Sequence, residues 1–407
     1  MAINIKTYQL AWLVVSLIML QPITLSAQFS IEVGGSVVPE LSIGGGFSDY
    51  NYNGINAGFR DWRLGIRETN LLTTFRLPKG FNVNSRLLLI RRYGAELNRL
   101  TFARLNLEYQ PSNKLSFKLG RVMIPFGNFY DRPLPQDRLL ITAPLGYLSY
   151  TNISNQVGYT SNLYEPQILE VDGQLDYGIP LLYELGYGNG FRLDWDIKPD
   201  TFEVDLAVLM ASPSHRANRS SPIHPTVVLR TEFRPTYFWK HGFSASYGGF
   251  MQSNSLNEEL DLSRYKQLIV GTHAILGYTY FEIKGEVMAS LFQVPQFLSD
   301  STGFLLDDNH DVQRQNLSSI SAYADAKVEM PFWPGAYVVY RYEFLGFQSP
   351  GNDPILSDWD DNVVRHSIGI GFEISRNILF KSAVAVQDVQ NRNWDLRQWR
   401  SSLILFF

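Results

Sequence analysis

The side chains best suited to catalysis or metal binding in this chain are its six histidines, and their spacing matches none of the common motifs. No two histidines stand at His-x-x-x-His spacing, and the His-Glu-x-x-His helix motif of zinc hydrolases is absent. The chain has no cysteine, so thiolate metal sites, a cysteine nucleophile, a lipidated N-terminal cysteine and disulfides are all excluded. We therefore expect no metal centre and no cofactor. The histidines are His215, His224, His241, His273, His310 and His366.

Two further segments could carry chemistry. The run Asp307-Asp308-Asn309-His310-Asp311 is acidic enough to bind Ca²⁺, but it lacks the glycine and the terminal glutamate of an EF-hand loop. We interpret it as a solvated acidic loop. Ser214 and His215 are adjacent, yet no Gly-x-Ser-x-Gly motif is present, and Gly44-Gly45-Gly46 is not followed by the Lys-Ser/Thr of a phosphate loop. The sequence therefore favours a protein that is not an enzyme.

The charges are mixed. The chain has 35 Lys and Arg against 39 Asp and Glu, for a net charge of −4, and it contains no basic run. Nucleic-acid binding, which depends on clustered cations, is not expected.

The elements that must position these charges are strands with alternating polarity. In 281–292, Phe281, Ile283 and Val287 share one face, while Lys284 and Glu286 share the other. Segments 201–211, 226–234, 336–347 and 363–374 alternate in the same way. Strands of about ten residues with one apolar and one polar face are typical of a transmembrane barrel, where the apolar face meets lipid. Aromatic residues make up 14% of the chain and suit the girdles at the two lipid–water interfaces. A water-facing soluble sheet remains the alternative.

Turns between these strands alternate between short and long, as they do in outer-membrane barrels. Seven short turns and eight longer loops predict an all-β, antiparallel transmembrane β-barrel of sixteen strands, with fourteen to eighteen left open. The short turns are expected at 78–80, 110–114, 198–200, 235–241, 277–279, 331–335 and 375–377. The longer loops are expected near 48–61, 92–98, 124–180, 212–224, 253–265, 294–315, 348–362 and 391–394.

Both ends of the chain fit export to an outer membrane. Lys6 precedes an apolar run over 10–20 that is too short to span a membrane as a helix, and Ala27 provides a cleavage site. We expect residues 1–27 to be a signal peptide and residues 28–407 to be the barrel. At the other end, Trp399, Leu403, Leu405 and Phe407 share one face of a strand. A terminal Phe407 resembles the signal that the barrel-assembly machinery recognises. Outer-membrane lipid and lipopolysaccharide are then the expected surroundings.

The connection at 124–180 is too long for a simple hairpin loop, and such loops are usually functional. Pro125, Pro133 and Pro135 keep it out of the sheet. We expect it to fold into the lumen, where fixed charges would set ion selectivity; an outward loop with solvated charges is the alternative. The candidate constriction charges are Arg121, Asp131, Arg132, Asp137 and Arg138.

One motif resembles a known family. The stretch Lys118-Leu119-Gly120-Arg121-Val-Met-Ile124-Pro125-Phe126-Gly127 resembles the L-G-x-x-x-x-P-F-G strand-to-loop signature of phosphate-selective porin O/P-type barrels and their wider porin relatives. The resemblance implies a sixteen-stranded pore with a lumenal loop, often assembled as a homotrimer.

The charges expected to line the lumen carry both signs, which fits a general or weakly selective pore better than a phosphate pore. The predicted function is passive diffusion of small hydrophilic solutes or ions. A non-conducting barrel that serves as an adhesin, a scaffold or a rim-site hydrolase is the alternative. The lumen-lining candidates are Arg104, Glu108, Lys118, Arg230, Glu232, Arg234, Glu282, Lys284, Glu286, Arg341, Glu343 and Arg365.

Overall fold

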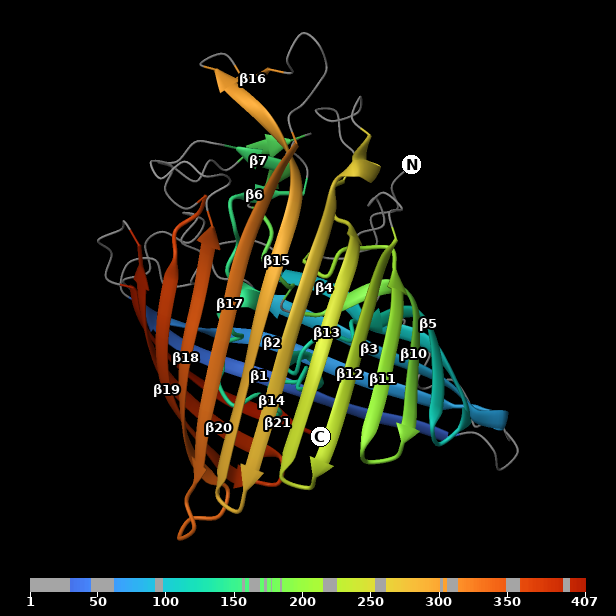
Figure 1. Cartoon of the computed structure of the whole chain (residues 1–407). Helices are drawn as coiled ribbons and strands as arrows, with labels where there is room; N and C mark the ends of the chain where they lie inside the picture. The colour runs from blue at the N-terminus through green and yellow to red at the C-terminus, as the bar shows by residue number, and fades with distance from the viewer. Residues whose placement is uncertain are drawn as a thin grey trace, which may run out of the picture.

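The computed structural model shows sixteen long antiparallel strands that form a closed barrel (Figure 1). It describes residues 30–44, 62–91, 98–155, 158–160, 169–171, 174–176, 178–183, 185–214, 225–252, 261–300, 303–305, 314–348, 359–390 and 396–407. The all-β fold and the strand number predicted from the sequence are confirmed. The barrel strands are β1 (Ser30–Gly44), β2 (Arg63–Arg76), β3 (Phe81–Arg91), β4 (Asn98–Ser112), β5 (Leu115–Met123), β10 (Tyr187–Lys198), β11 (Phe202–Leu209), β12 (Thr226–Thr236), β13 (Trp239–Gly249), β14 (Lys266–Tyr278), β15 (Phe281–Asp300), β17 (Arg314–Glu329), β18 (Ala336–Gln348), β19 (Val363–Ser375), β20 (Ile378–Val389) and β21 (Leu396–Phe406).

The barrel closes where the last strand pairs with the first. Ser36 of β1 lies opposite Phe406 of β21, and the pairing continues to Gly44 opposite Gln398. Beyond it, Gly35 and Phe407 exchange two backbone hydrogen bonds of 3.1 Å each. A Cβ at Gly35 would lie 2.8 Å from the Phe407 ring, so a glycine is needed there. Closure leaves no unpaired edge, which a strand in lipid could not satisfy.

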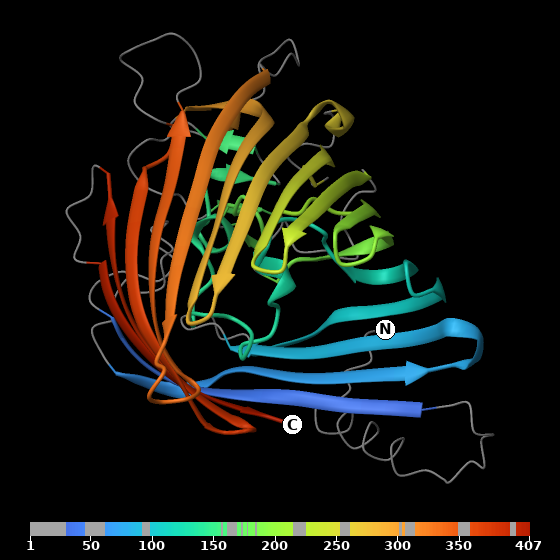
Figure 2. The ribbon, with the colours of Figure 1, turned by 60° about the horizontal axis from the view of Figure 1, so that its bottom comes forward.

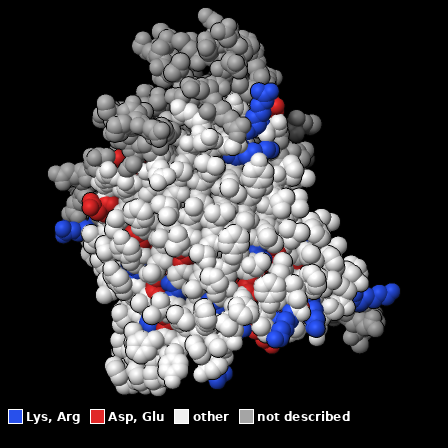
Figure 3. Space-filling model, viewed as in Figure 1, with Lys and Arg blue, Asp and Glu red and all other residues white. Residues whose placement is uncertain are grey.

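Alternation along the strands separates an apolar outer face from a polar inner one. On β15, the outward Phe281 and Ile283 are exposed, whereas the inward Lys284 and Glu286 are buried. Figure 3 shows an area in the upper part of this face without charged side chains, and only small charged patches across the middle and lower part. Such a face suits the hydrocarbon layer of a membrane. Among the described residues, no helix is long and apolar enough to cross a membrane.

The seven predicted short turns all join neighbouring strands at one end of the barrel. One of them is tighter than expected. We expected a turn over 235–241, but Thr236 still pairs with Trp239, so only Tyr237 and Phe238 remain outside the strands. Aromatic residues crowd this end, and Tyr237, Tyr278 and Phe332 are among the most exposed large side chains. They suit the interface between lipid and water.

The long connections contain short elements of their own. These are η2 (Phe129–Asp131), α2 (Leu145–Leu148), β6 (Ile153–Ser154), β7 (Gly158–Thr160), β8 (Leu169–Val171), β9 (Gln174–Asp176), η3 (Leu262–Arg264) and β16 (Gly303–Leu305), while η1 (Pro78–Gly80) forms the short turn between β2 and β3. Three sequence interpretations, the signal peptide 1–27, the acidic loop 307–311 and His215, lie outside the described residues.

The connection between β5 and β10 ends at residue 186, slightly later than expected. We call residues 124–155 the inner segment and residues 178–186, of which Glu184 is not described, the return segment. Figure 2 shows this connection inside the ring of strands rather than outside it.

Candidate functional site

The chain leaves the wall at Ile124, whose amide makes a last bond of 2.9 Å to the Gly186 carbonyl. Pro125 cannot donate to a neighbouring strand, and Gly127 adopts a φ of 61°. A Cβ at Gly127 would lie 1.9 Å from Glu286 Oε1, so this turn requires glycine. The next residue, Asn128, donates its amide to Glu286 Oε2 at 3.3 Å. The Pro-Phe-Gly part of the motif therefore directs the chain inward.

Apolar packing holds the inner segment against the wall. Its buried residues form one cluster with inward-facing side chains of β11, β12, β14, β15 and β17. Two inward positions without side chains make room for it, because a Cβ at Gly271 would lie 3.3 Å from Phe126 and one at Gly369 would lie 2.6 Å from Leu140. The cluster comprises Val122, Ile124, Phe126, Phe129, Tyr130, Ala143, Tyr147, Leu182, Ala207, Leu209, Val228, Ile269, Met288 and Tyr323.

Buried charges on β18 to β20 bind the backbone of the inner segment. Arg341 donates to the Thr142 carbonyl at 3.0 Å, and Arg365 donates to the Ala143 carbonyl at 2.8 Å. Lys381 donates to the carbonyls of Pro135 at 2.7 Å and Gln136 at 3.3 Å, and also to that of Arg138. Backbone carbonyls of an irregular segment need such donors when water is excluded. These cations therefore anchor the inner segment.

The strand register supplies the matching anions. Asp325 of β17 lies directly opposite Arg341 of β18 and accepts two hydrogen bonds from it. Glu343 lies opposite Arg365 and accepts from it at 2.5 and 2.7 Å. Glu343 also accepts from the Leu145 amide at 3.0 Å. Buried ion pairs are tolerated when further hydrogen bonds satisfy their remaining groups, as the Leu145 amide does for Glu343.

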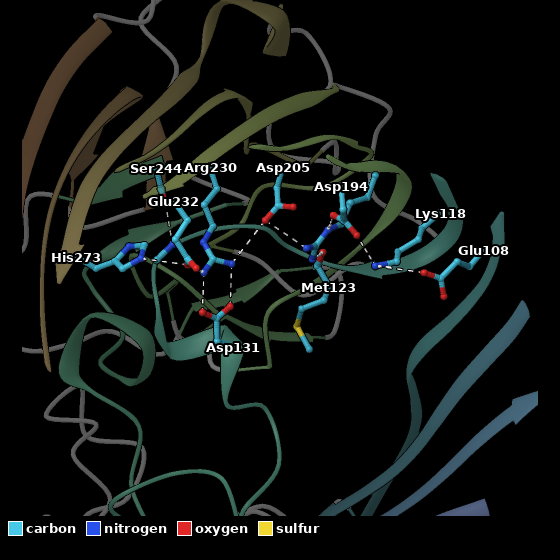
Figure 4. Close-up of polar contacts among 12 residues, drawn as sticks. Glu108, Lys118, Met123, Asp131, Asp194, Asp205, Arg230, Glu232, Ser244 and His273 are labelled. Carbon is cyan, nitrogen blue, oxygen red and sulfur yellow. Dashed lines mark hydrogen bonds and ion pairs between the residues drawn. The ribbon is translucent and has the colours of Figure 1, made fainter. Parts of the chain in front are cut away.

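Along the wall from β4 to β13, eight charged residues form a continuous row that we call the charge belt. Figure 4 shows most of it, from Glu108 to Glu232. Lys118 binds Asp194 and lies 3.7 Å from Glu108; Arg192 binds Asp194 and lies 3.4 Å from Asp205. Arg230 lies 3.6 Å from Asp205 and 2.5 Å from Glu232, and Lys240 lies 2.6 Å from Glu232. The signs largely alternate along the wall. In order, the belt comprises Glu108, Lys118, Asp194, Arg192, Asp205, Arg230, Glu232 and Lys240.

Asp131 ties the inner segment to the belt. Its carboxylate accepts hydrogen bonds of 2.8 and 2.6 Å from Arg230 and one of 3.0 Å from Lys240. Burial acts against ionisation here, but the charges of Arg230 and Lys240 outweigh it and hold the pKa of Asp131 below its usual value. Asp131 is therefore ionised at neutral pH.

The next two residues reach opposite walls. Arg132 pairs with Glu282 of β15 at 2.7 Å, and the Pro133 carbonyl accepts from Arg86 of β3 at 3.1 Å. Around the ring, the steps from β3 to β15 pass through β4, β5, β10, β11, β12, β13 and β14, which is half of the circuit. The contacts from Glu282 through Arg132 and Pro133 to Arg86 therefore cross the lumen. We call this arrangement the bridge.

The structure separates the five predicted constriction charges. Asp131 and Arg132 lie at the belt and the bridge, and Asp137 is exposed at a bend that its amide closes on the Leu134 carbonyl. Arg138 is buried and donates to the Pro133 carbonyl at 2.9 Å, so it supports the fold of the segment. Arg121 stacks 4.0 Å above the buried Tyr187 ring. The guanidinium groups of Arg138 and Arg121 are thus both engaged in contacts within the protein.

The twelve lumen-lining candidates also divide. Five face inward and lie buried beneath the inner segment: Lys284, Glu286, Arg341, Glu343 and Arg365. The other seven lie in or beside the charge belt and the bridge: Arg104, Glu108, Lys118, Arg230, Glu232, Arg234 and Glu282. Lys240 was missed because it was placed in a turn. A two-residue turn at 237–238 would have put it on the inner face with Ser244.

Comparisons with known proteins bear on the fold. No family model matches this sequence, and no curated protein does either. Among solved structures, the outer membrane channel DcaP of Acinetobacter baumannii aligns with a TM-score of 0.59 at 9% identity, covering 95% of this chain and 100% of that one. An anion-selective porin from Comamonas acidovorans aligns with a TM-score of 0.58 at 9% identity, covering 93% of this chain and 100% of that one. OmpF of Salmonella typhi, solved with daunomycin, aligns with a TM-score of 0.57 at 9% identity, covering 93% of this chain and 98% of that one. The chain thus has the fold of outer-membrane porins.

Proposed function

We propose that this protein is a bacterial outer-membrane channel through which small hydrophilic solutes or ions diffuse passively. The observation that carries the proposal is the bridge. Arg132 and Pro133 hold a segment across a wide barrel, and charged side chains of the belt face it. A barrel of sixteen strands is wide enough for an aqueous lumen, and an inner segment narrows it to a size that can discriminate.

The proposed selectivity is weak. The belt holds four acids and four bases, each within 4 Å of an opposite charge. Paired charges of both signs cancel over a short distance and leave little net field for either kind of ion. A phosphate pore, as in the O/P-type family, would present successive cations instead. The resemblance to that family is limited to the strand-to-loop motif.

The proposed surroundings follow from the outer face. Export by the signal peptide 1–27, assembly through Phe407 and contact with lipid and lipopolysaccharide belong to this proposal. A homotrimer does as well. It is supported by outward hydroxyl pairs on neighbouring strands, Thr73 with Ser85 at 2.6 Å and Ser382 with Ser401 at 2.8 Å. Hydroxyl groups are better placed against a protein surface than against lipid tails.

The test is reconstitution of the mature protein in a planar lipid bilayer under a KCl gradient. Discrete current steps with a reversal potential near zero are expected for a weakly selective channel. Protein that folds, as judged by a heat-dependent shift in gel mobility, but gives no steps would contradict the proposal. The non-conducting barrel would then become the better explanation.

A further inference from the structure

We infer that solutes cross on one side of the bridge only, and that the opposite side of the barrel is sealed by the inner segment. The open side is the inner face of β4, β5 and β10, which carries Glu108, Lys118, Asp194 and Arg192 of the charge belt. Further along the same wall, the inner segment already packs over parts of β11, β12 and β14. The sealed side is the inner face of β17 to β21, β1 and β2. This inference rests on the proposed channel function and specifies which wall sets its selectivity.

Four cations on the sealed side donate hydrogen bonds to backbone carbonyls of the inner segment. Arg341, Arg365 and Lys381 are at most 2% exposed and donate to inner-segment carbonyls. On β2, Arg67 donates to the Ile141 carbonyl at 2.9 Å and to Glu40 at 3.2 Å. Arg341, Arg365 and Lys381 are buried in these contacts and are therefore not accessible to a passing solute.

Apolar contacts fill the space between those polar groups. Leu139 and Leu140 of the inner segment are buried with Val339 of β18. Nearer the short turns, Val38, Leu379 and Ile404 form another buried cluster on inward positions of β1, β20 and β21. A cavity of about 10 Å³ between the inner segment and this wall, lined in part by Val38 and Ile404, offers room for about one water molecule.

The seal continues to the end of the barrel with the long loops. Leu145, Ile153 and Leu181 pack in one apolar cluster with ends of β15, β17, β18, β19 and β20. Trp359 is buried in the same cluster, and the next residue, Asp360, accepts from the Asn152 amide at 2.8 Å. Apolar packing therefore closes this side from the bridge to the far loops.

On the open side the side chains keep contact with solvent. Lys118 is 19% exposed and Asp194 is 16% exposed, although both are paired. The bridge residues Arg132 and Glu282 are 25% and 21% exposed. Lys118, Asp194 and Glu108 are therefore the wall residues that would determine selectivity, whereas the sealed-side cations Arg341, Arg365 and Lys381 would not.

The absence of cysteine in the chain allows a direct test with single introduced thiols. Lys118→Cys and Asp194→Cys report on the open side, and Ser367→Cys and Ser402→Cys report on the sealed side. Leu119→Cys, next to Lys118 on the exposed outer face, is the matched control. Each folded variant is reconstituted in a bilayer, and a water-soluble charged methanethiosulfonate is added to either compartment while current is recorded.

Modification is expected to change the current through Lys118→Cys and Asp194→Cys within minutes and to leave Ser367→Cys, Ser402→Cys and Leu119→Cys unchanged. Current changes of similar size and rate at sealed-side cysteines would overturn the inference, as would a lack of response at both open-side positions. If one open-side variant does not fold, the other decides the outcome. An unmodified protein without current steps would instead refute the channel function itself, so the two failures are distinguishable.

Discussion

Arg230 and Asp131 form a bidentate hydrogen-bonded pair, in which Nη1 donates to Oδ1 at 2.8 Å and Nη2 donates to Oδ2 at 2.6 Å. Arg230 belongs to strand β12 and Asp131 to η2 of the inner segment, 99 residues earlier in the sequence. A planar guanidinium fixes the orientation of its carboxylate partner as well as its distance. The pair therefore sets where the inner segment stands relative to the charge belt.

Asp131→Asn should weaken this attachment, because an amide cannot accept both hydrogen bonds from Arg230. We expect a loss of about 1.5–3 kcal/mol in the free energy of unfolding, the usual value for hydrogen bonds to a charged group. Thermal unfolding in detergent would measure it. Asp137→Asn is the control, because that carboxylate is exposed on the same segment, and an equal loss there would contradict the specific role of Asp131.

The contribution of the Asp131 carboxylate should also make the stability of the protein depend on pH. The folded pKa of Asp131 lies below its usual value of 3.8, so its ionised form stabilises the fold above that value. This contribution is lost as the pH falls from about 3.8 through the lower folded pKa. The stability difference between the unmodified protein and Asp131→Asn should be constant from pH 5 to 7 and shrink below pH 4. A difference that persists unchanged at pH 3 would refute the assignment.

Arg132 and Arg138 should behave differently although both are cations of the inner segment. Arg132→Gln removes a partly exposed charge from the bridge, and we expect a shift of the reversal potential toward cations. Arg138→Gln should lower thermal stability and leave the reversal potential in place, because that side chain is buried against Glu68 and the Pro133 carbonyl. Bilayer recordings under a KCl gradient compare the two. Equal shifts would show that Arg138 also faces the passage.

Gly369 should be sensitive to the addition of one methyl group. In Gly369→Ala the new Cβ would lie 2.6 Å from Leu140 Cδ2, and overpacking of this kind costs about 1–3 kcal/mol. Truncation of the neighbour, as in Gly369→Ala with Leu140→Ala, should recover part of that loss. Gly277→Ala is the matched control, because nothing lies within 4 Å of a Cβ there. Thermal unfolding that is equally perturbed at both glycines would exclude contact with the inner segment as the cause.

The barrel could be predicted because its strands and turns depend on residues that are close together in the sequence. Alternation such as Ile283, Lys284 and Ile368, Ser367 repeats every second residue, and turn residues punctuate it, so strand number and facing follow from the sequence alone. The C-terminal Phe407 likewise marked the strand that closes the ring. These features require no knowledge of which strands lie opposite one another.

The site was only partly predictable, because it depends on contacts across the lumen. Arg341 and Lys118 have similar sequence contexts, because both are cations on the inward face of a strand with alternating polarity. Only the path of the inner segment decides that Arg341 is buried under Thr142 while Lys118 keeps contact with solvent. Arg121 differs from Lys118 for another reason. The neighbouring Gly120 has a φ of 121°, and the Arg121 guanidinium stacks on the Tyr187 ring.

The bridge also has a mechanical consequence. A ring of sixteen strands is a thin-walled tube, and lateral pressure from a membrane can flatten such a tube into an ellipse. The pair of Arg132 with Glu282 and the bond from Arg86 to Pro133 fasten the inner segment to walls half a circuit apart. They form a non-covalent cross-link between opposite walls, because the barrel can widen along this diameter only if one of these contacts breaks. The same contacts that narrow the lumen would therefore keep its cross-section round.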